Sequence, residues 1–160
     1  MSRFITLCLA AATAIASLSA AQAADIVGTW KLESMAISNS EGARNEIPWG
    51  NAYLIYTAGG RVMTVGTTDN RPGLSGDASS APEAERAIAY STMFAYTGRY
   101  AITEDHVVHH VDTAWNPNWV GTEQERVFNL TDDTLVLRTL PMDSDGAQVF
   151  LELIWKREAD

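Results

Sequence analysis

The sequence predicts an all-β fold in which eight antiparallel strands close into a barrel, with one helix between the third and fourth strands. From Gly28 to Lys156, short runs of alternating apolar and polar residues recur, separated by turns rich in Gly, Asp and Asn. Short meandering strands of this number favour a closed barrel, because closure removes unpaired sheet edges and can leave room for one small ligand. The expected strands span residues 28–36, 52–57, 61–65, 96–102, 106–114, 122–130, 134–140 and 148–156.

The one convincing helix signal downstream of the N-terminal region covers residues 82–95. Ser80 is placed to cap this helix, Pro82 falls in its first turn, and Glu83 follows three residues after the cap. The preceding residues, 67–80, are dense in Gly, Pro, Asp, Asn and Ser and predict a loop. Loop and helix are expected either to cover an open end of the barrel as a lid or to pack on its outer wall.

The N-terminal residues 1–23 are expected to be a secretory signal peptide. Arg3 gives a positive start, an apolar run continues to about Leu18, and Ala21-Gln22-Ala23 fits a small-x-small cleavage site. The apolar run is short for a membrane span, although a retained N-terminal anchor stays an alternative. We therefore expect a periplasmic or secreted protein with a single barrel domain over residues 24–160 and no later membrane segment.

The composition of the chain disfavours several kinds of binding partner and several kinds of cysteine chemistry. The formal net charge is −9 and no basic run occurs, which disfavours nucleic acid and anionic membranes as partners. The single cysteine, Cys8, lies in the expected signal peptide. The mature domain should therefore have no disulfide, thiolate metal ligand or cysteine nucleophile. Neither the oligomeric state nor the pathway follows from these numbers.

Three polar side chains fall on strand faces that otherwise look apolar. His109 shares a face with Val107 and Val111 by the period-two rule, and Gln124 and Arg126 occupy the corresponding face of the next strand. Burying an imidazole, an amide and a guanidinium is unfavourable unless they pair with each other or with a ligand. The pattern indicates a lined cavity without naming its contents.

An ordered set of short motifs resembles the lipocalin-like domain family of small bacterial and fungal proteins. The motifs, spread over the whole expected domain, are Gly28-Thr29-Trp30, Tyr53-Leu54-Ile55-Tyr56-Thr57, Tyr96-Thr97-Gly98-Arg99-Tyr100, His109-His110, Pro117-Asn118-Trp119-Val120-Gly121-Thr122, Gln124-x-Arg126 and Leu135-x-Leu137-x-Thr139. The resemblance implies an eight-stranded lipocalin-type barrel. It implies function only loosely, because carrying small hydrophobic molecules is a property of classical lipocalins and reaches this chain by analogy of fold.

His109 and Arg126 are the leading candidates for ligand contacts. Arginine offers a planar fork of donors to a carboxylate, enolate or phenolate, and histidine can donate or accept near neutral pH. The structural alternative is an internal pair in which Arg126 bonds a buried acid or backbone carbonyls. The remaining ligand-binding candidates are Tyr100 and Gln124 on the inner faces and Tyr53, Tyr96 and Trp119 at the mouth. Trp30 is expected to close one end of the barrel, against an arginine if one is near.

A metal site or a cofactor is not expected. His106 and His110 share one strand face with Asp112, whereas His109 lies on the other, so the three histidines do not converge on one ion. Neither a nucleophile elbow nor a glycine-rich phosphate loop occurs.

The function that fits these patterns best is binding of a small, mainly hydrophobic molecule with a polar or anionic group in the barrel cavity. One rival is a cofactor-free isomerase, cyclase or dehydratase in which His109 moves a proton while Arg126 and Tyr100 stabilise negative charge. Another is a barrel filled by its own side chains that binds nothing.

Overall fold

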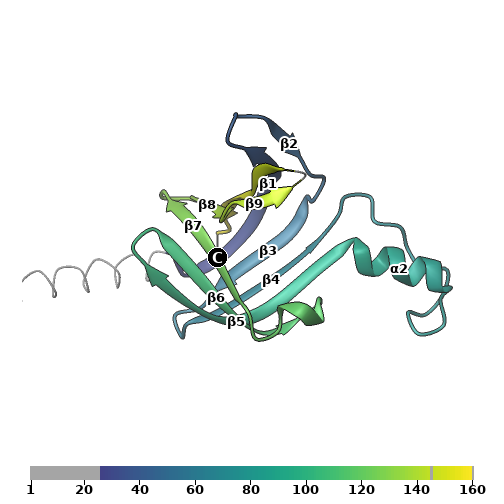
Figure 1. Cartoon of the computed structure of the whole chain (residues 1–160). Coiled ribbons are helices and arrows are strands. Elements are labelled where there is room, and N and C mark those ends of the chain that lie inside the picture. Colours follow the sequence, from purple (N-terminus) through teal and green to yellow (C-terminus); the bar gives the residue numbers. More distant parts are fainter. Residues whose placement is uncertain (1–25, 145, 160) are drawn as a thin grey trace, which may run out of the picture.

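The computed structural model describes residues 26–144 and 146–159, so the predicted signal peptide lies outside the described residues. Eight long strands form one antiparallel barrel (Figure 1). They are β1 (Gly28–Asn39), β3 (Asn51–Tyr56), β4 (Arg61–Thr67), β5 (Met93–Thr103), β6 (His106–Ala114), β7 (Glu123–Leu130), β8 (Thr134–Thr139) and β10 (Ala147–Arg157). Two three-residue strands, β2 (Arg44–Glu46) and β9 (Met142–Ser144), extend the sheet at its ends.

The barrel closes where the first long strand meets the last. β1 pairs with β10 from Trp30–Arg157 to Asn39–Val149, while the other long strands follow one another in sequence order. Closure gives both edges of the long-strand sheet a partner. The predicted eight-stranded barrel, with its helix between the third and fourth long strands, is confirmed. Within the described ranges, no helix has the length and apolar character needed to cross a bilayer.

Alternation along each strand divides the barrel into an inner and an outer face. In β4, Val62 and Thr64 are buried inside, whereas Met63 and Val65 are exposed outside. Burial of a large apolar side chain contributes about 1.5–3 kcal/mol, so the inner face provides most of the stability. The buried core consists of Ile26, Trp30, Leu32, Met35, Ala52, Leu54, Tyr56, Val62, Val107, Phe128, Leu135, Leu137, Leu153 and Trp155.

Trp30 fills one end of this core. Its side chain is fully buried, its Nε1 atom donates to the carbonyl oxygen of Ile26 at 2.9 Å, and the guanidinium of Arg157 lies 4.1 Å from its ring centre. An arginine over an indole face adds a cation–π attraction to the packing. The end of the barrel at which β1 begins is therefore closed, as the sequence predicted.

A β-bulge between β5 and β6 shapes another part of the barrel wall. The register shifts between Thr97 and Gly98, so that Gly98 pairs with Val111 while Thr97 pairs with Thr113. A Cβ atom on Gly98 would lie 2.1 Å from the carbonyl oxygen of His110, which explains why glycine stands there. The shift leaves His109 buried on the inner face next to Tyr100.

The helix α2 (Glu83–Ser91) is shorter than the 82–95 that the sequence predicts. Met93–Ala95 belong to β5, where they pair with the end of β4 and gain ladder hydrogen bonds that a helix end would not provide. The predicted cap is also wrong. Ser80 donates its hydroxyl to the carbonyl of Asp77, and Pro82 occupies the N-cap position without a capping side chain.

Helix α2 extends away from the barrel, beyond the start of β5 (Figure 1). It buries none of its residues. Apart from Ser91 at its C-terminal end, which reaches the cavity described below, it neither covers the open end as a lid nor packs along the outer wall, the two arrangements that the sequence left open. Its attachment lies at its C-terminal end, where the Tyr90 ring stacks on Trp115 at 4.5 Å and the Trp115 Nε1 atom donates to the Tyr90 carbonyl.

Candidate functional site

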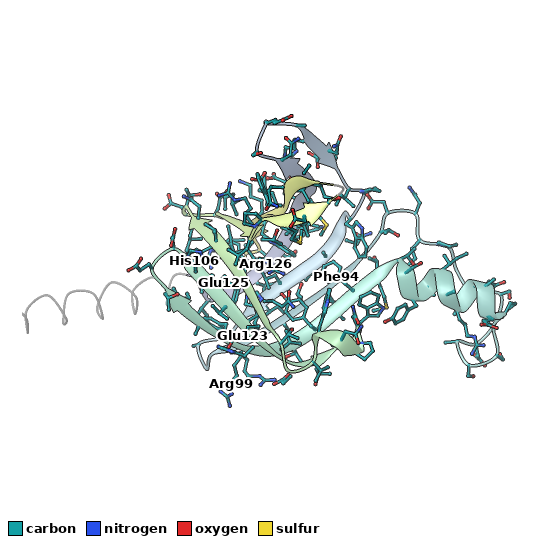
Figure 2. The ribbon with its side chains drawn as sticks, viewed as in Figure 1. Phe94, Arg99, His106, Glu123, Glu125 and Arg126 are labelled. Carbon is teal, nitrogen blue, oxygen red and sulfur yellow. The ribbon has the colours of Figure 1, made fainter. Side chains whose placement is uncertain are left out.

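The barrel contains a partly open cavity of about 320 Å³ at the end where β5 begins. Its wall is mostly apolar and aromatic, and all eight long strands contribute to it. Figure 2 marks two of its residues, Phe94 at the start of β5 and Arg126 on β7. The lining residues are Met35, Ile47, Trp49, Leu54, Thr64, Ser91, Met93, Phe94, Tyr96, His109, Trp115, Trp119, Arg126, Leu137, Leu151, Leu153 and Trp155.

Aromatic rings packed against one another form part of this wall. The Trp49 and Phe94 rings lie 5.1 Å apart, and Trp119 packs edge-on against Tyr96 at 5.9 Å and against Trp115 at 5.8 Å. Trp119 lies in the short 3-10 helix η1 (Pro117–Trp119), which the Asn116 side chain caps by accepting from the Asn118 backbone N–H. Tilted and edge-on contacts are favourable for aromatic pairs, so they hold the rings in place.

The polar centre of the wall is His109, which bridges two tyrosines. Its Nε2 atom lies 2.7 Å from the Tyr56 hydroxyl, and its Nδ1 atom lies 2.7 Å from the Tyr96 hydroxyl. His109 is 1 % exposed and comes from β6, whereas the tyrosines come from β3 and β5. Both ring nitrogens are thus hydrogen-bonded, which is how a buried imidazole avoids an unsatisfied polar atom.

Burial fixes the protonation state of this centre. Desolvation, then the nearby Arg126 charge and His110, lowers the pKa of His109 to about 3. Desolvation also raises the pKa of Tyr96 to about 12, against the opposing effect of Arg126, and raises that of Tyr56 well above its ordinary value. At neutral pH the imidazole is therefore neutral and both phenols keep their protons.

Arg126 brings a positive charge to the wall beside this centre. Its Nη1 atom donates to the Glu125 carbonyl at 2.7 Å, and its Nη2 atom donates to the Gln124 side-chain oxygen at 3.2 Å. Gln124 in turn donates to the Thr122 hydroxyl at 3.1 Å. No carboxylate pairs with Arg126 among the residues that the structure describes.

The structure brings four of the seven predicted ligand-binding residues onto the cavity wall. They are His109, Arg126, Tyr96 and Trp119. Gln124 does not line the cavity, but its side-chain oxygen accepts a hydrogen bond from Arg126. Tyr100 also lies off the wall, because its hydroxyl donates to the Thr57 carbonyl at 3.1 Å.

Tyr53 lies on the outer face of the barrel, so the prediction that it lines the mouth of the cavity is wrong. It is 37 % exposed and points outward, because Ala52, Leu54 and Tyr56 take the inner face of β3. It cannot line the mouth of the cavity as predicted. The inner residue that sequence reasoning missed is Tyr56, whose signal was its even spacing from Leu54.

Comparison with known proteins identifies the fold family. The family model described as "Lipocalin-like domain" matches residues 27–158. A protein of Aspergillus oryzae named 4'-hydroxy-3'-methoxypropiophenone carrier protein is 34% identical over 87 residues, which cover 49% of this chain and 78% of that protein.

Two solved structures are also similar. A lipocalin-like protein from Bacteroides uniformis has a TM-score of 0.46 and 11% identity, with 84% of this chain and 99% of that chain covered. An uncharacterized protein from Bacteroides eggerthii has a TM-score of 0.45 and 12% identity, with 84% and 100% covered. The family match spans nearly all the described residues, and we conclude that this chain belongs to the lipocalin-like domain family.

Proposed function

We propose that this protein binds one small, mainly hydrophobic molecule with a polar or anionic group inside its barrel. The observation that carries the proposal is the cavity of about 320 Å³, whose largely apolar wall has one polar centre at Tyr96, His109 and Arg126. Small-molecule sites are typically mostly apolar, with a few placed polar groups that orient the ligand. The cavity also weighs against a barrel filled entirely by its own side chains.

The size of the cavity limits the ligand. Small-molecule pockets usually measure roughly 300–1,000 Å³, and an apolar cavity of about 150 Å³ is enough for benzene. A cavity of about 320 Å³ therefore suits one substituted aromatic ring or an apolar skeleton of similar size. Larger ligands would have to extend through the open end.

We also propose that the protein carries this molecule outside the cytoplasm, in the periplasm or as a secreted protein. Residues 1–23 support the location, with Arg3, an apolar run and the small-x-small site at Ala21–Ala23. The name of the Aspergillus oryzae relative supports a carrier role but refers to that protein's own ligand. Mass spectrometry of the protein from the native periplasm or medium should find an N-terminus at Ala24.

The rival enzyme, which would use His109, Arg126 and Tyr100, has less support. Both His109 nitrogens are hydrogen-bonded, and with its pKa lowered to about 3 by burial, the imidazole is a weak base at neutral pH. The Tyr100 hydroxyl is bonded to the Thr57 carbonyl, away from the cavity wall.

Native mass spectrometry, followed by solvent extraction of whatever co-purifies, tests ligand binding directly. Two matched substitutions place the site: Met93→Trp fills the cavity, whereas Met63→Trp adds the same ring on the outer face, where Met63 is 48 % exposed. We expect Met93→Trp to lose the bound molecule and Met63→Trp to keep it.

Two results would contradict this proposal. The first is a wild-type protein that purifies without a bound molecule and whose melting temperature does not change on addition of small hydrophobic acids, phenols or ketones. The second is the reverse pattern, with binding lost in Met63→Trp and kept in Met93→Trp.

A further inference from the structure

We infer that the cavity binds its ligand through an oxygen anion, the deprotonated oxygen of a phenol, enol or carboxylic acid, held by the Tyr96 hydroxyl and the Arg126 guanidinium. This inference rests on the proposed ligand binding and adds the chemical class of the ligand. Three observations carry it: the positive charge that Arg126 gives the cavity wall, the direction of the hydrogen bonds through His109, and the N–H donors of Arg126 that its two hydrogen bonds do not use.

The charge on the cavity wall is positive although the protein is acidic. The chain has 20 acidic and 11 basic residues, yet the lining set contains one arginine and neither aspartate, glutamate nor lysine. Glu123 and Glu125, the acidic neighbours of Arg126 on β7, are exposed on the outer face (Figure 2). A cation in a mostly apolar cavity, with no carboxylate partner in the described part of the chain, favours an anionic ligand.

The two hydrogen bonds through His109 involve three protons, those of Tyr56, Tyr96 and the neutral imidazole, so one hydroxyl proton is left without an acceptor in these bonds. Tyr56 is 1 % exposed, and its hydroxyl bonds only the Nε2 atom of His109 within the described ranges. The Tyr56 proton therefore belongs to that bond, and Nε2 accepts it. In a neutral imidazole the other nitrogen then carries the ring proton, so Nδ1 donates to the Tyr96 oxygen.

This direction leaves the Tyr96 hydroxyl proton free for a ligand. The opposite tautomer would use the Tyr96 proton on Nδ1 and leave the Tyr56 proton without an acceptor inside the core, which is unfavourable. Tyr96 lines the cavity, whereas Tyr56 does not. Tyr56 is thus a positioning residue, which acts through His109 to make Tyr96 a donor toward the cavity.

Arg126 supplies further donors on the same cavity wall as Tyr96. A guanidinium has five N–H groups, and the bonds to the Glu125 carbonyl and the Gln124 side chain use two of them. Its charge reaches Tyr96 and His109, since it acts on the pKa of both. The ionisable groups on the wall are Tyr96, His109 and Arg126, with Tyr56 behind them, and none can become negative at neutral pH.

These features predict that a weak acid becomes a stronger acid in the cavity. The probe is 4-nitrophenol, which fits a single-ring cavity and whose phenolate absorbs at a longer wavelength than the phenol. A pH titration of the bound probe by absorbance gives its pKa in the complex. We expect that pKa to fall by about one unit or more, which means about tenfold tighter binding of the phenolate than of the phenol.

Four variants identify the groups responsible. Arg126→Met and Tyr96→Phe should each bring the pKa of the bound probe back toward its value in water. Tyr56→Phe should have the same effect, although Tyr56 does not touch the probe. Without the Tyr56 proton, the imidazole can carry its own proton on Nε2, and Nδ1 then accepts the Tyr96 proton that the probe would otherwise receive. Tyr100→Phe is the control and should leave the pKa of the bound probe unchanged, since its hydroxyl bonds the Thr57 carbonyl.

The neutral analogue 4-nitrotoluene separates this inference from ligand binding itself. If wild-type protein binds both compounds but raises the pKa of 4-nitrophenol, the anion site is overturned while ligand binding stands. If neither compound binds, nor any other small hydrophobic molecule, the proposed function fails with it. The direction in which wild-type protein shifts the pKa of bound 4-nitrophenol tests the anion site even if one of the variants does not fold.

Discussion

His109 joins two tyrosines that reach the barrel interior from separate strands. Its ring nitrogens lie 2.7 Å from the hydroxyls of Tyr56 and Tyr96, and a neutral imidazole satisfies both contacts because one nitrogen accepts while the other donates. Protonation would bury a charge in a mostly apolar interior, and that charge would also lie near the positive charge of Arg126. That is the physical reason why the pKa of His109 falls to about 3.

This shift makes folding stability depend on pH in a definite direction. The unfolded chain takes up a proton on His109 near pH 6.5, whereas the folded protein does so only near pH 3. Between these values the unfolded state binds more protons, so the free energy of unfolding falls by about 1.4 kcal/mol per pH unit as the pH decreases. Above pH 6.5 His109 is neutral in both the folded and the unfolded state, so its effect on the free energy of unfolding no longer changes with pH.

Urea unfolding between pH 7 and pH 4 measures the effect. The His109→Gln variant should be less stable at pH 7 but lose stability less steeply on acidification than the wild type. His110→Gln removes an exposed histidine from the adjacent position and should keep the wild-type slope. Equal slopes in the wild type and His109→Gln would mean that His109 does not titrate with folding.

Residue-level prediction from the sequence succeeded where it depended only on which face a side chain occupies. Period two placed His109 and Arg126 inside, and both line the cavity. It could not identify Tyr56 as the partner of His109, because β3 and β6 are not neighbours in the sheet. A contact across the interior depends on the curvature of the barrel and the register of its strands. The alternation of residues within one strand determines neither.

At the level of elements, the bulge at Gly98 connects strand geometry to the site. Thr97 pairs with Thr113, yet Gly98 already pairs with Val111, and this shift carries His109 to its position opposite Tyr100. Two backbones approach closely at this point, since a Cβ on Gly98 would lie 2.1 Å from the His110 carbonyl oxygen. The bulge therefore depends on glycine.

Gly98→Ala should destabilise the protein by about 3 kcal/mol, because the strands must separate to admit the methyl group. The matched control is Gly73→Ala, since a Cβ on Gly73 meets nothing within 4 Å. Chemical unfolding of both variants gives the comparison. A Gly98→Ala protein as stable as the control would show that β5 and β6 can separate there at little expense.

Element boundaries were predicted well where turns bound the strands and poorly where a local irregularity intervened. A bulge between Leu32 and Ser34 in β1 puts Met35 on the cavity wall, whereas uninterrupted alternation from Trp30 and Leu32 would place it on the outer face. The helix was extended through Met93–Ala95 because an apolar run at its end fits helix and strand equally well. In the structure, Met93–Ala95 pair with β4 and therefore belong to a strand.

The whole molecule separates stability from binding by placing them at opposite ends of the barrel. Trp30 closes one end, with its Nε1 atom bonded to Ile26 and its ring under Arg157. Trp119 stands at the other end, half-buried on the cavity wall and packed edge-on against Tyr96. The same residue type therefore has a different role at each end, which one pair of identical substitutions can test.

Trp30→Phe should lower the free energy of unfolding by about 1–3 kcal/mol, because it removes a buried hydrogen bond and leaves a gap beneath Arg157. Its affinity for 4-nitrophenol should stay within about twofold of wild type, since Trp30 does not line the cavity. Trp119→Phe should show the converse, with stability within about 1 kcal/mol of wild type and affinity reduced several-fold. Urea unfolding and titration of the probe on both proteins measure the four quantities. A Trp30→Phe protein that binds as weakly as Trp119→Phe would mean that the closed end helps to shape the cavity, and that packing and binding are coupled through the barrel wall.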